Sequence, residues 1–177
     1  ARGLKLNTPK SEDVRPTTDR VKESLFNIIN PYIMDGDILD LFAGTGSLGI
    51  ECLSRGANKC VFVDLNRSSI DIVKSNIKKA RVEENSEVMN VDFKSAIERV
   101  KNNSYKFDVI FMDPPYYKDM FQDALERIDK SNILKEDGII VVEHDTKQEF
   151  PENVGNLVKN RNKKYGNTTL TFYSMED

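Results

Sequence analysis

The chain has 177 residues, of which 38% are hydrophobic and 31% charged, and we expect one globular domain over residues 1–177. No apolar run approaches the roughly 20 residues of a membrane helix, and the formal net charge of -3 argues against a protein that coats nucleic acid by bulk charge. Cys52 and Cys60 lack the spacing of a disulfide framework or a metal site, so we expect reduced thiols, no metal and a cytoplasmic protein.

A basic segment and a helix come first along the chain. Residues 1–18 carry Arg2, Lys5, Lys10 and Arg15, and we interpret them as a basic N-terminal segment that leads into the domain. In TTDRVKESLFNII, residues 17–29, apolar residues recur on one helical face after Asp19, which is a candidate N-cap. This pattern predicts a helix that packs on the core.

Five strand-like segments then alternate with helical patterns. The predicted strands are residues 37–42, 60–65, 87–92, 107–113 and 138–144, each bounded by Gly, Asn or Asp. The first helix predicted between strands, SLGIECLSRG, ends in Gly56 as a C-terminal cap. The next begins after Ser68 and Ser69 and has apolar residues at helical spacing. Residues 95–103 and 119–130 supply two further helices.

This alternation predicts a doubly wound α/β fold with helices on both faces of the sheet. The last segment, residues 156–175, has a Gly166-Asn167 turn between two stretches of alternating polar and apolar residues, which is typical of an antiparallel hairpin. We therefore expect a mostly parallel, seven-stranded sheet with a C-terminal antiparallel hairpin. In such sheets, ligands bind beyond the carboxyl ends of the strands.

A glycine-rich loop, DLFAGTGSLG, follows the first predicted strand at residues 40–49. Gly44, Gly46 and Gly49 satisfy G-x-G-x-x-G, and glycines there permit a tight turn and close backbone approach to a ligand. The spacing alone is typical of a dinucleotide site, and Asp64 stands twenty positions after Gly44, where a ribose-binding acid belongs. Spacing therefore leaves the class of cofactor open.

Acidic residues near the strand ends narrow that choice. Asp40 precedes the glycine loop, and Asp64 and Asp92 end the second and third predicted strands. A ring of carboxylates repels a pyrophosphate and attracts a cationic ligand. S-adenosylmethionine is such a ligand, because it has a sulfonium, an ammonium and a ribose diol but no phosphate. Each acid alone is better explained as a strand-end cap or a turn residue, so the prediction depends on the combination of the three acids with the glycine loop.

The fourth predicted strand stops at DPPY, residues 113–116. Pro114 has no backbone N–H and pushes Asp113 toward an extended conformation, so the strand must end there. Asp113 and the Pro114 carbonyl could each accept one N–H of a nucleobase amino group, which turns the nitrogen lone pair toward a methyl donor. Tyr116 is expected to stack on a flipped base, and Pro115 to shape the wall. A plain strand terminator is the alternative interpretation.

Three motifs together, LDLFAGTGSLGIE, DPPY and RPTTDRVKESLFN, resemble the RsmD family of bacterial 16S rRNA guanine-N2 methyltransferases. The resemblance covers nearly the whole chain, including VVEH in the fifth predicted strand and KKYGNTTLTFY near the end. It implies the Rossmann-like class I methyltransferase fold, S-adenosylmethionine as donor and one guanine of 16S rRNA as acceptor. The rRNA could be naked or part of a partly assembled small subunit, and we expect a monomer without an obligate protein partner.

The resemblance also implies roles for individual residues. The implied cofactor contacts are Asp40, Ala43, Gly44, Gly46, Asp64, Asp92 at the adenine end, Thr17 and Thr18. The implied contacts to the target base are Asp113, Pro114 and Tyr116, and Arg15 lies with the two threonines across the mouth of the cofactor site. The sequence begins at Ala1, without the Met and short basic lead usual before RG in this family, so we expect part of an RNA-binding edge to be absent.

Two further features bear on the substrate. Lys163 and Lys164 belong to a basic cluster near the end of the chain, which we predict to contact RNA phosphates, with a solvated edge as the alternative. His144, the one histidine, follows a buried strand, so a structural role is favoured over that of a general base.

Other functions stay open at the level of sequence. One is an amino-methyltransferase that acts on adenine or on a protein glutamine, although sequence-specific DNA methylation would call for a target-recognition domain that this length cannot hold. A nicotinamide-dependent oxidoreductase is favoured by the glycine fingerprint and disfavoured by the acids. A nucleic-acid-binding module without catalysis is the third possibility, and the intact DPPY argues against it.

Overall fold

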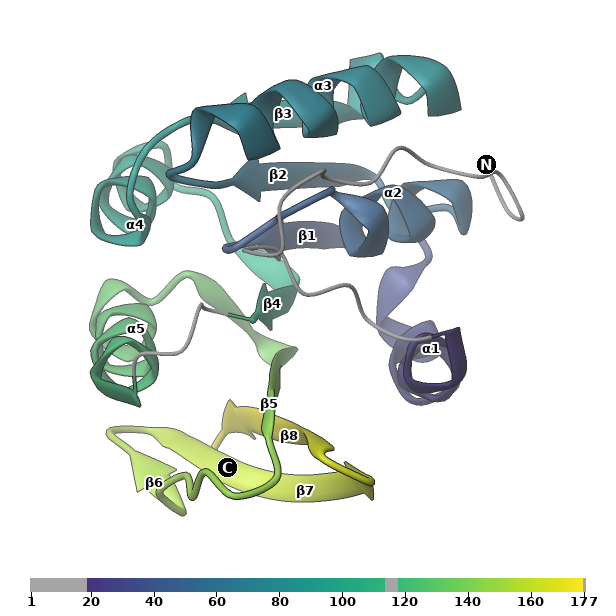
Figure 1. Ribbon diagram of the computed structural model, residues 1–177. Helices are drawn as coiled ribbons and strands as arrows, with labels where there is room; N and C mark the ends of the chain where they lie inside the picture. The colour runs from purple at the N-terminus through teal and green to yellow at the C-terminus, as the bar shows by residue number, and fades with distance from the viewer. Residues whose placement is uncertain (1–18, 114–117, 177) are drawn as a thin grey trace.

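The short apolar segments of the sequence pair into one eight-stranded sheet in the computed structural model, which describes residues 19–113 and 118–176 (Figure 1). The strand order is β3-β2-β1-β4-β5-β8-β7-β6, with parallel pairing from β3 to β5 and antiparallel pairing beyond. The strands are β1 (Asp37–Asp40), β2 (Lys59–Val63), β3 (Ser86–Met89), β4 (Phe107–Met112), β5 (Leu134–Asp145), β6 (Asn153–Val154), β7 (Leu157–Tyr165) and β8 (Thr168–Met175). The predicted doubly wound fold with a C-terminal antiparallel hairpin is confirmed.

The sheet has one strand more than the seven predicted. The additional strand, β6, has two residues and pairs with the first two residues of β7. Two residues are too few to show the alternation by which a strand is recognised in a sequence. The first three strands also end two or three residues earlier than predicted, because the chain leaves the ladder there to form the loops at the carboxyl edge.

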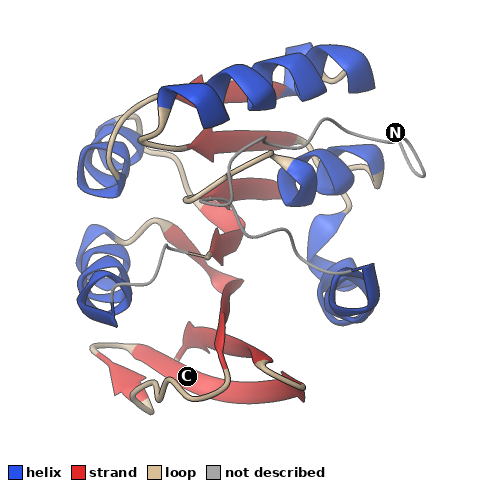
Figure 2. Cartoon of the chain, viewed as in Figure 1, coloured by secondary structure: helices blue, strands red, loops and turns tan. Residues whose placement is uncertain are grey.

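Helices cover both faces of the sheet (Figure 2). They are α1 (Asp19–Ile33), α2 (Ser47–Ser54), α3 (Arg67–Ala80), α4 (Phe93–Asn102) and α5 (Lys118–Ser131), with a short 3-10 helix η1 (Glu83–Asn85). Helices α4 and α5 pack with one face of the sheet in a first hydrophobic cluster, and α1, α2 and α3 pack with the other face in a second. No helix in residues 19–113 and 118–176 is both long and apolar enough to cross a membrane.

Three helix boundaries can be compared with the cap residues that the sequence indicated. Helix α3 begins one residue before the predicted Ser68 and Ser69, because the side chain of Asn66 caps it and accepts the backbone N–H groups of both serines. Helix α2 ends at Ser54, and Gly56 follows with φ +102°, the left-handed conformation expected of a glycine that terminates a helix. Helix α1 begins at Asp19, the residue predicted as its cap.

The third glycine of the glycine loop serves the packing of α2 on β2. A Cβ at Gly49 would overlap the ring of Phe62 and lie 2.6 Å from Sγ of Cys60. Cys52 and Cys60 are both free and buried in this region, as the sequence predicted. Gly49 therefore lets α2 approach β2 closely.

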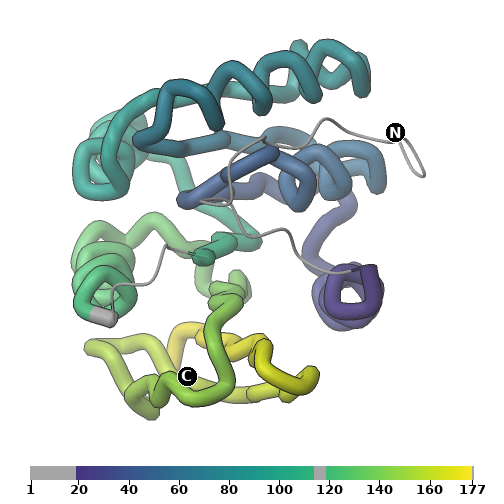
Figure 3. Tube along the Cα trace, in the orientation of Figure 1, coloured from purple at the N-terminus to yellow at the C-terminus, as the bar shows by residue number. Residues whose placement is uncertain are grey.

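Helix α1 and the C-terminal hairpin, far apart in sequence, lie side by side (Figure 3). The hydroxyl groups of Ser24 and Tyr165 form a hydrogen bond, and the guanidinium of Arg20 lies over the Tyr165 ring. The tip of the hairpin is also tied to the end of β5, since Thr146 N donates to the Asn167 carbonyl at 2.8 Å. These contacts position the hairpin at the carboxyl edge of the parallel strands.

Candidate active site

A cavity of about 910 Å³ lies at the carboxyl ends of the strands. Its walls come from the glycine loop, the residues that follow β2, β3 and β4, and the end of β5. The chain runs from β1 outward to β2 and β3 and then returns to place β4 on the other side of β1, so the cavity lies at the switch point of the sheet. This is the position at which an open α/β sheet binds its ligand.

The glycine loop is held in a defined shape. Gly44 and Gly46 have φ of +60° and +80°, which side chains rarely permit. The Asn76 side chain of α3, fully buried, donates to the Thr45 carbonyl at 2.9 Å. Ala43 and Gly44 line the cavity, whereas Gly46 is the N-cap residue of α2 and is absent from the lining among the described residues.

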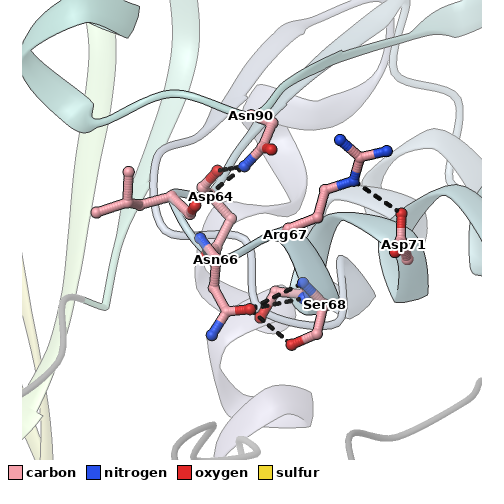
Figure 4. Close-up of polar contacts among 8 residues, drawn as sticks. Asp64, Asn66, Arg67, Ser68, Asp71 and Asn90 are labelled. Atoms are coloured by element: carbon pink, nitrogen blue, oxygen red, sulfur yellow. Dashed lines mark hydrogen bonds and ion pairs between the residues drawn. The ribbon is translucent and has the colours of Figure 1, made fainter.

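Asp64, drawn with Asn66 and Asn90 in Figure 4, connects the end of β2 to the glycine loop through a hydrogen bond to Gly44. Its Oδ2 accepts the backbone N–H of Gly44 at 2.9 Å, and its Oδ1 accepts that of Asn66 at 2.9 Å. The Asn90 side chain donates to the carbonyls of Asp64 and Leu65 at 3.1 and 3.0 Å. Burial raises the pKa of Asp64, although the two N–H donors act in the opposite direction. The carboxylate is thus oriented within the protein, and each oxygen keeps a lone pair for a ligand hydroxyl.

Asp40 is the deepest acid of the cavity, with a relative exposure of 3%. Its pKa is raised to about 7, because burial and, to a smaller extent, the charge of Asp64 raise it more than the backbone N–H of Gly49 lowers it. Its Oδ2 is buried and has no hydrogen-bond partner among the described residues. A buried carboxyl oxygen of this kind is stabilised by a bound cation or donor, so Asp40 fits a positively charged ligand.

Asp92 has two structural roles. It lines the cavity, and it is also the N-cap of α4, where Oδ1 accepts the backbone N–H of Ser95 at 2.7 Å. That hydrogen bond lowers the pKa of Asp92. Beside it, Val91, Phe93 and Leu65 present apolar surface to the same cavity, and Leu65 is 72% exposed.

Asp113 directly follows β4 and is half-buried in the same cavity. It therefore faces the volume that Asp40, Gly44 and Asp64 also line. The other residues predicted for the target base or for the mouth of the site lie outside the described residues; they are Arg15, Thr17, Thr18, Pro114, Pro115 and Tyr116.

The charge of the cavity is strongly asymmetric. The described lining has six acidic residues, Asp40, Asp64, Asp92, Asp113, Glu143 and Asp145, against a single lysine, Lys147. Within residues 19–113 and 118–176, no cluster of three or more His, Cys, Asp or Glu side chains could hold a metal ion. The chemistry of the walls favours an organic cation.

The comparison with known families settles the membership of the chain. Residues 1–174 match the family model described as Conserved hypothetical protein 95. The chain belongs to this family. The resemblance to the RsmD methyltransferases is confirmed, since Ribosomal RNA small subunit methyltransferase D of Haemophilus influenzae is 41% identical over 143 residues, 80% of this chain and 74% of that protein.

Two other similar proteins match a larger share of this chain. The Bacillus subtilis protein YlbH, named as a candidate rRNA methyltransferase, is 44% identical over 172 residues, 97% of this chain and 94% of YlbH. The solved structure of the Escherichia coli protein yhhF, described as a candidate methyltransferase, superposes with a TM-score of 0.85 at 29% identity, covering 98% of this chain and 93% of yhhF. The fold is that of the class I methyltransferases.

His144 of this family member is engaged on both ring nitrogens. Nδ1 lies 2.8 Å from the Asp145 carbonyl, which can only accept, so Nδ1 carries the proton. Nε2 then accepts from the Thr171 hydroxyl at 2.7 Å, and the ring packs 4.2 Å from that of Phe150, centroid to centroid. This arrangement favours the structural role that the sequence indicated.

The basic cluster near the C-terminus consists of four residues that β7 spreads along its length, Lys159, Arg161, Lys163 and Lys164. Lys163 and Lys164 are exposed on β7 opposite Leu170 and Thr169, near the hairpin tip and the edge where the cavity lies. Lys159 lies toward the other end of β7, where its Nζ contacts Glu152 at 3.0 Å and the Phe150 carbonyl at 3.3 Å. Lys159 therefore serves the local fold, and Lys163 and Lys164 are the members of the cluster nearest the hairpin tip and the cavity edge.

Sequence reasoning missed several residues that shape the site. Asn66, Asn76 and Asn90 hold the loops around Asp64 and Thr45 through hydrogen bonds to backbone groups. Asn90 directly follows β3 and Asn66 lies three residues after β2, and their places just beyond strands are the signal that could have identified them. Glu143, an acid that follows the apolar run of β5, also lines the cavity.

Proposed function

We propose that this chain transfers a methyl group from S-adenosylmethionine to the N2 amino group of a guanine in 16S rRNA by direct displacement. One observation carries the proposal: Asp113, at the end of β4, lines the same cavity as the glycine loop and Asp64. A group able to orient a nucleobase amine thus adjoins a nucleoside-type site. The names of the Haemophilus influenzae and Bacillus subtilis relatives support rRNA as the substrate.

The residues of the cavity fit the proposed donor. Asp64 would bind the ribose hydroxyls, and the backbone of Ala43 and Gly44 would line the methionine portion beside the uncompensated Oδ2 of Asp40. Leu65, Val91 and Phe93 offer apolar surface for adenine next to Asp92. When bound, S-adenosylmethionine supplies a methyl group activated by an adjacent sulfonium.

The same walls disfavour the nicotinamide alternative. A dinucleotide brings a pyrophosphate with two negative charges, and the described lining offers six carboxyl groups and one lysine. The repulsion between a phosphate and several nearby carboxylates outweighs the attraction that the backbone N–H groups of a glycine loop provide. Calorimetric titration with S-adenosylmethionine and with NAD would separate the two classes of cofactor.

Asp113 is the proposed catalytic acid–base group. An exocyclic amine is a weak nucleophile because its lone pair is delocalised into the ring. An N–H donated to Asp113, and a second donated to the Pro114 carbonyl, would turn that lone pair toward the methyl carbon. As the nitrogen gains the methyl group it becomes positively charged; Asp113 stabilises that charge, and the proton leaves to Asp113 or water. Tyr116 and Pro115 are proposed from sequence to hold the flipped base.

The remaining features of the proposal concern the assembly in which the reaction occurs. We propose a single-domain monomer over residues 1–177 that acts in the cytoplasm on naked 16S rRNA or on a partly assembled small subunit. Lys163 and Lys164, near the cavity edge, would contact phosphates, as would Arg15. Such contacts position the RNA without specifying the base.

Single-turnover transfer of a labelled methyl group to small-subunit rRNA tests the proposal. The product nucleoside is identified by mass against N2-methylguanosine and N6-methyladenosine standards. Asp113→Ala should slow transfer by about 100-fold or more, by analogy with loss of one preorganised hydrogen-bonding group, while cofactor affinity changes little. Near-wild-type turnover of this variant would refute the mechanism, and methyladenosine as the product would refute the substrate.

A further inference from the structure

The cavity continues past Asp113 to a wall formed by β5, β8 and α1. This wall contains Glu143, Leu170 and Leu25. Glu143 has a relative exposure of only 7%, although it is an acid, and it directly follows the apolar residues 139–142 of β5. This wall therefore adds a carboxyl group to the cavity, beside two leucines that also line it.

The register of the sheet puts Glu143 beside Asp113. Met112 pairs with Val142 in the parallel ladder between β4 and β5, so Asp113 and Glu143 follow at the same level. Neighbouring strands lie about 4.8 Å apart, which is close enough for two side chains to contact a single planar base.

The two side chains also belong to the same face of the sheet. Phe111 and Val141 pack in the cluster of α1, α2 and α3, whereas Met112 and Val142 pack in the cluster of α4 and α5. Side chains alternate along a strand, so the next residues, Asp113 and Glu143, return to the α1 side. Leu170, directly opposite Glu143 on β8, belongs to the α1 cluster as well.

The histidine and the other acids of the cavity lining lie elsewhere or make other contacts. His144 lies on the opposite face, where its ring contacts Phe150 and Thr171. Asp145 is used in the turn after β5, where Oδ1 accepts the backbone N–H of Lys147 at 2.9 Å. Asp40 ends β1 and Asp64 directly follows β2, on the cofactor side of Asp113. Glu143 is therefore the carboxyl group positioned next to the base-orienting acid.

We propose that Glu143 accepts the N1–H of the target guanine and thereby selects guanine over adenine. This inference rests on the proposed function. The Watson–Crick edge of guanine presents N1–H next to the N2 amino group, so a base whose N2–H is held by Asp113 directs N1–H to a neighbouring acceptor. Adenine has an unprotonated N1 at that edge, and its lone pair would face a carboxylate, which has no proton to donate. A site built to accept a hydrogen bond discriminates strongly against a ligand that lacks the donor.

The test compares two target bases that share the 2-amino group and differ in the proton on N1 and in the oxygen at C6. Synthetic RNAs span the nucleotide that the wild-type enzyme modifies and carry there either guanosine or 2-aminopurine riboside, which keeps the 2-amino group but has an unprotonated N1. The wild-type enzyme should methylate guanosine about 100-fold faster or more. In Glu143→Gln, the side-chain amide can donate to the unprotonated N1, so the ratio of the two rates should fall by about 10-fold or more.

Two control variants separate this effect from a general loss of activity. Glu136→Gln makes the same charge change on an exposed residue at the other end of β5 and should leave the ratio unchanged. Glu143→Ala should lower the rate on guanosine without raising the rate on 2-aminopurine. Because the readout is a ratio within one enzyme preparation, partial misfolding cancels.

The outcomes distinguish the inference from the proposed function. If the wild-type product is N2-methylguanosine and Glu143→Gln keeps the wild-type ratio, the role of Glu143 is refuted while the proposed function stands. If the wild-type product is N6-methyladenosine, both are refuted. A reduced ratio in Glu143→Gln alone, with an unchanged ratio in Glu136→Gln, would support the assignment.

Discussion

Replacing Asp40 by Asn should change how the stability of the protein depends on pH. The carboxyl group of Asp40 is buried, and its pKa is raised from 3.8 to about 7, chiefly by burial. The folded protein therefore holds this proton more tightly than the unfolded chain does. Between the two pKa values the folded state binds more protons, so the free energy of unfolding falls as pH rises through that window, and it is flat with respect to this group above it.

The size of the effect follows from the shift. Three pKa units at 1.36 kcal/mol each correspond to about 4 kcal/mol of stability lost between acidic and mildly alkaline pH. Asp40→Asn has no ionisable group at this position, so it should lack this part of the slope. The free energy of unfolding of the variant should equal that of the wild type at about pH 4 and exceed it by up to about 4 kcal/mol at about pH 8.

Urea denaturation over this pH range, with the wild type and Asp40→Asn side by side, measures the difference directly. Other titrating groups contribute to both curves, so the difference isolates Asp40. Binding of a cationic donor should also lower the pKa of Asp40, so the wild type should release a proton on binding S-adenosylmethionine near about pH 6.5, whereas the variant should not. Calorimetry in buffers of different ionisation enthalpy detects that proton. Parallel stability curves for the two proteins would refute the reasoning.

Three further predictions concern the cofactor, the RNA and the core. Asp64→Ala should weaken S-adenosylmethionine binding by about 1.5 to 3 kcal/mol, because it removes a charge-assisted hydrogen bond, and unchanged affinity in calorimetry would contradict the assignment of the β2 end. Neutralising Lys163 and Lys164 should reduce RNA affinity and flatten its salt dependence without changing the modified base, whereas the same change at the exposed Lys78 and Lys79 of α3 should not; an equal slope in both would mean a solvated edge. Gly49→Ala should lower the free energy of unfolding by about 1 to 3 kcal/mol through overlap with the Phe62 ring, and a denaturation curve like that of the wild type would show that α2 can shift at little cost.

Sequence reasoning identified the elements more reliably than their limits. The central strands were recognisable because β4, for example, is buried on both faces and therefore apolar at successive positions. The predicted strands extended too far because apolar residues continue beyond the last paired residue of the sheet. Leu41, for example, follows β1 and is fully buried, and its N–H donates to the Phe111 carbonyl at 3.1 Å. Hydrophobicity reports burial, and burial does not end where pairing ends.

The residues of the candidate site likewise include some that the sequence identified and others that it did not. Strand order brings Asp40, Asp64 and Asp113 to one cavity, because residues that end parallel strands meet at one edge. The start of α3 could not be chosen from sequence, since Asn66, Ser68 and Ser69 are all good caps and tertiary contacts decide between them. Glu143 was missed for a stronger reason: its proximity to Asp113 depends on the register between β4 and β5, which no single segment encodes.

The brevity of β6 has a practical consequence for anyone who alters the hairpin. Because β6 pairs only with Leu157 and Val158, the rest of β7 has β8 as its one neighbour among the described strands. An open strand edge can template growth of a sheet between molecules, and charged side chains, lysine above all, keep such edges apart. Alanine at Lys163 and Lys164 could thus make the enzyme self-associate and lower its apparent RNA affinity for an unrelated reason. Glutamate at the same positions would remove the attraction to phosphate and keep the molecules dispersed.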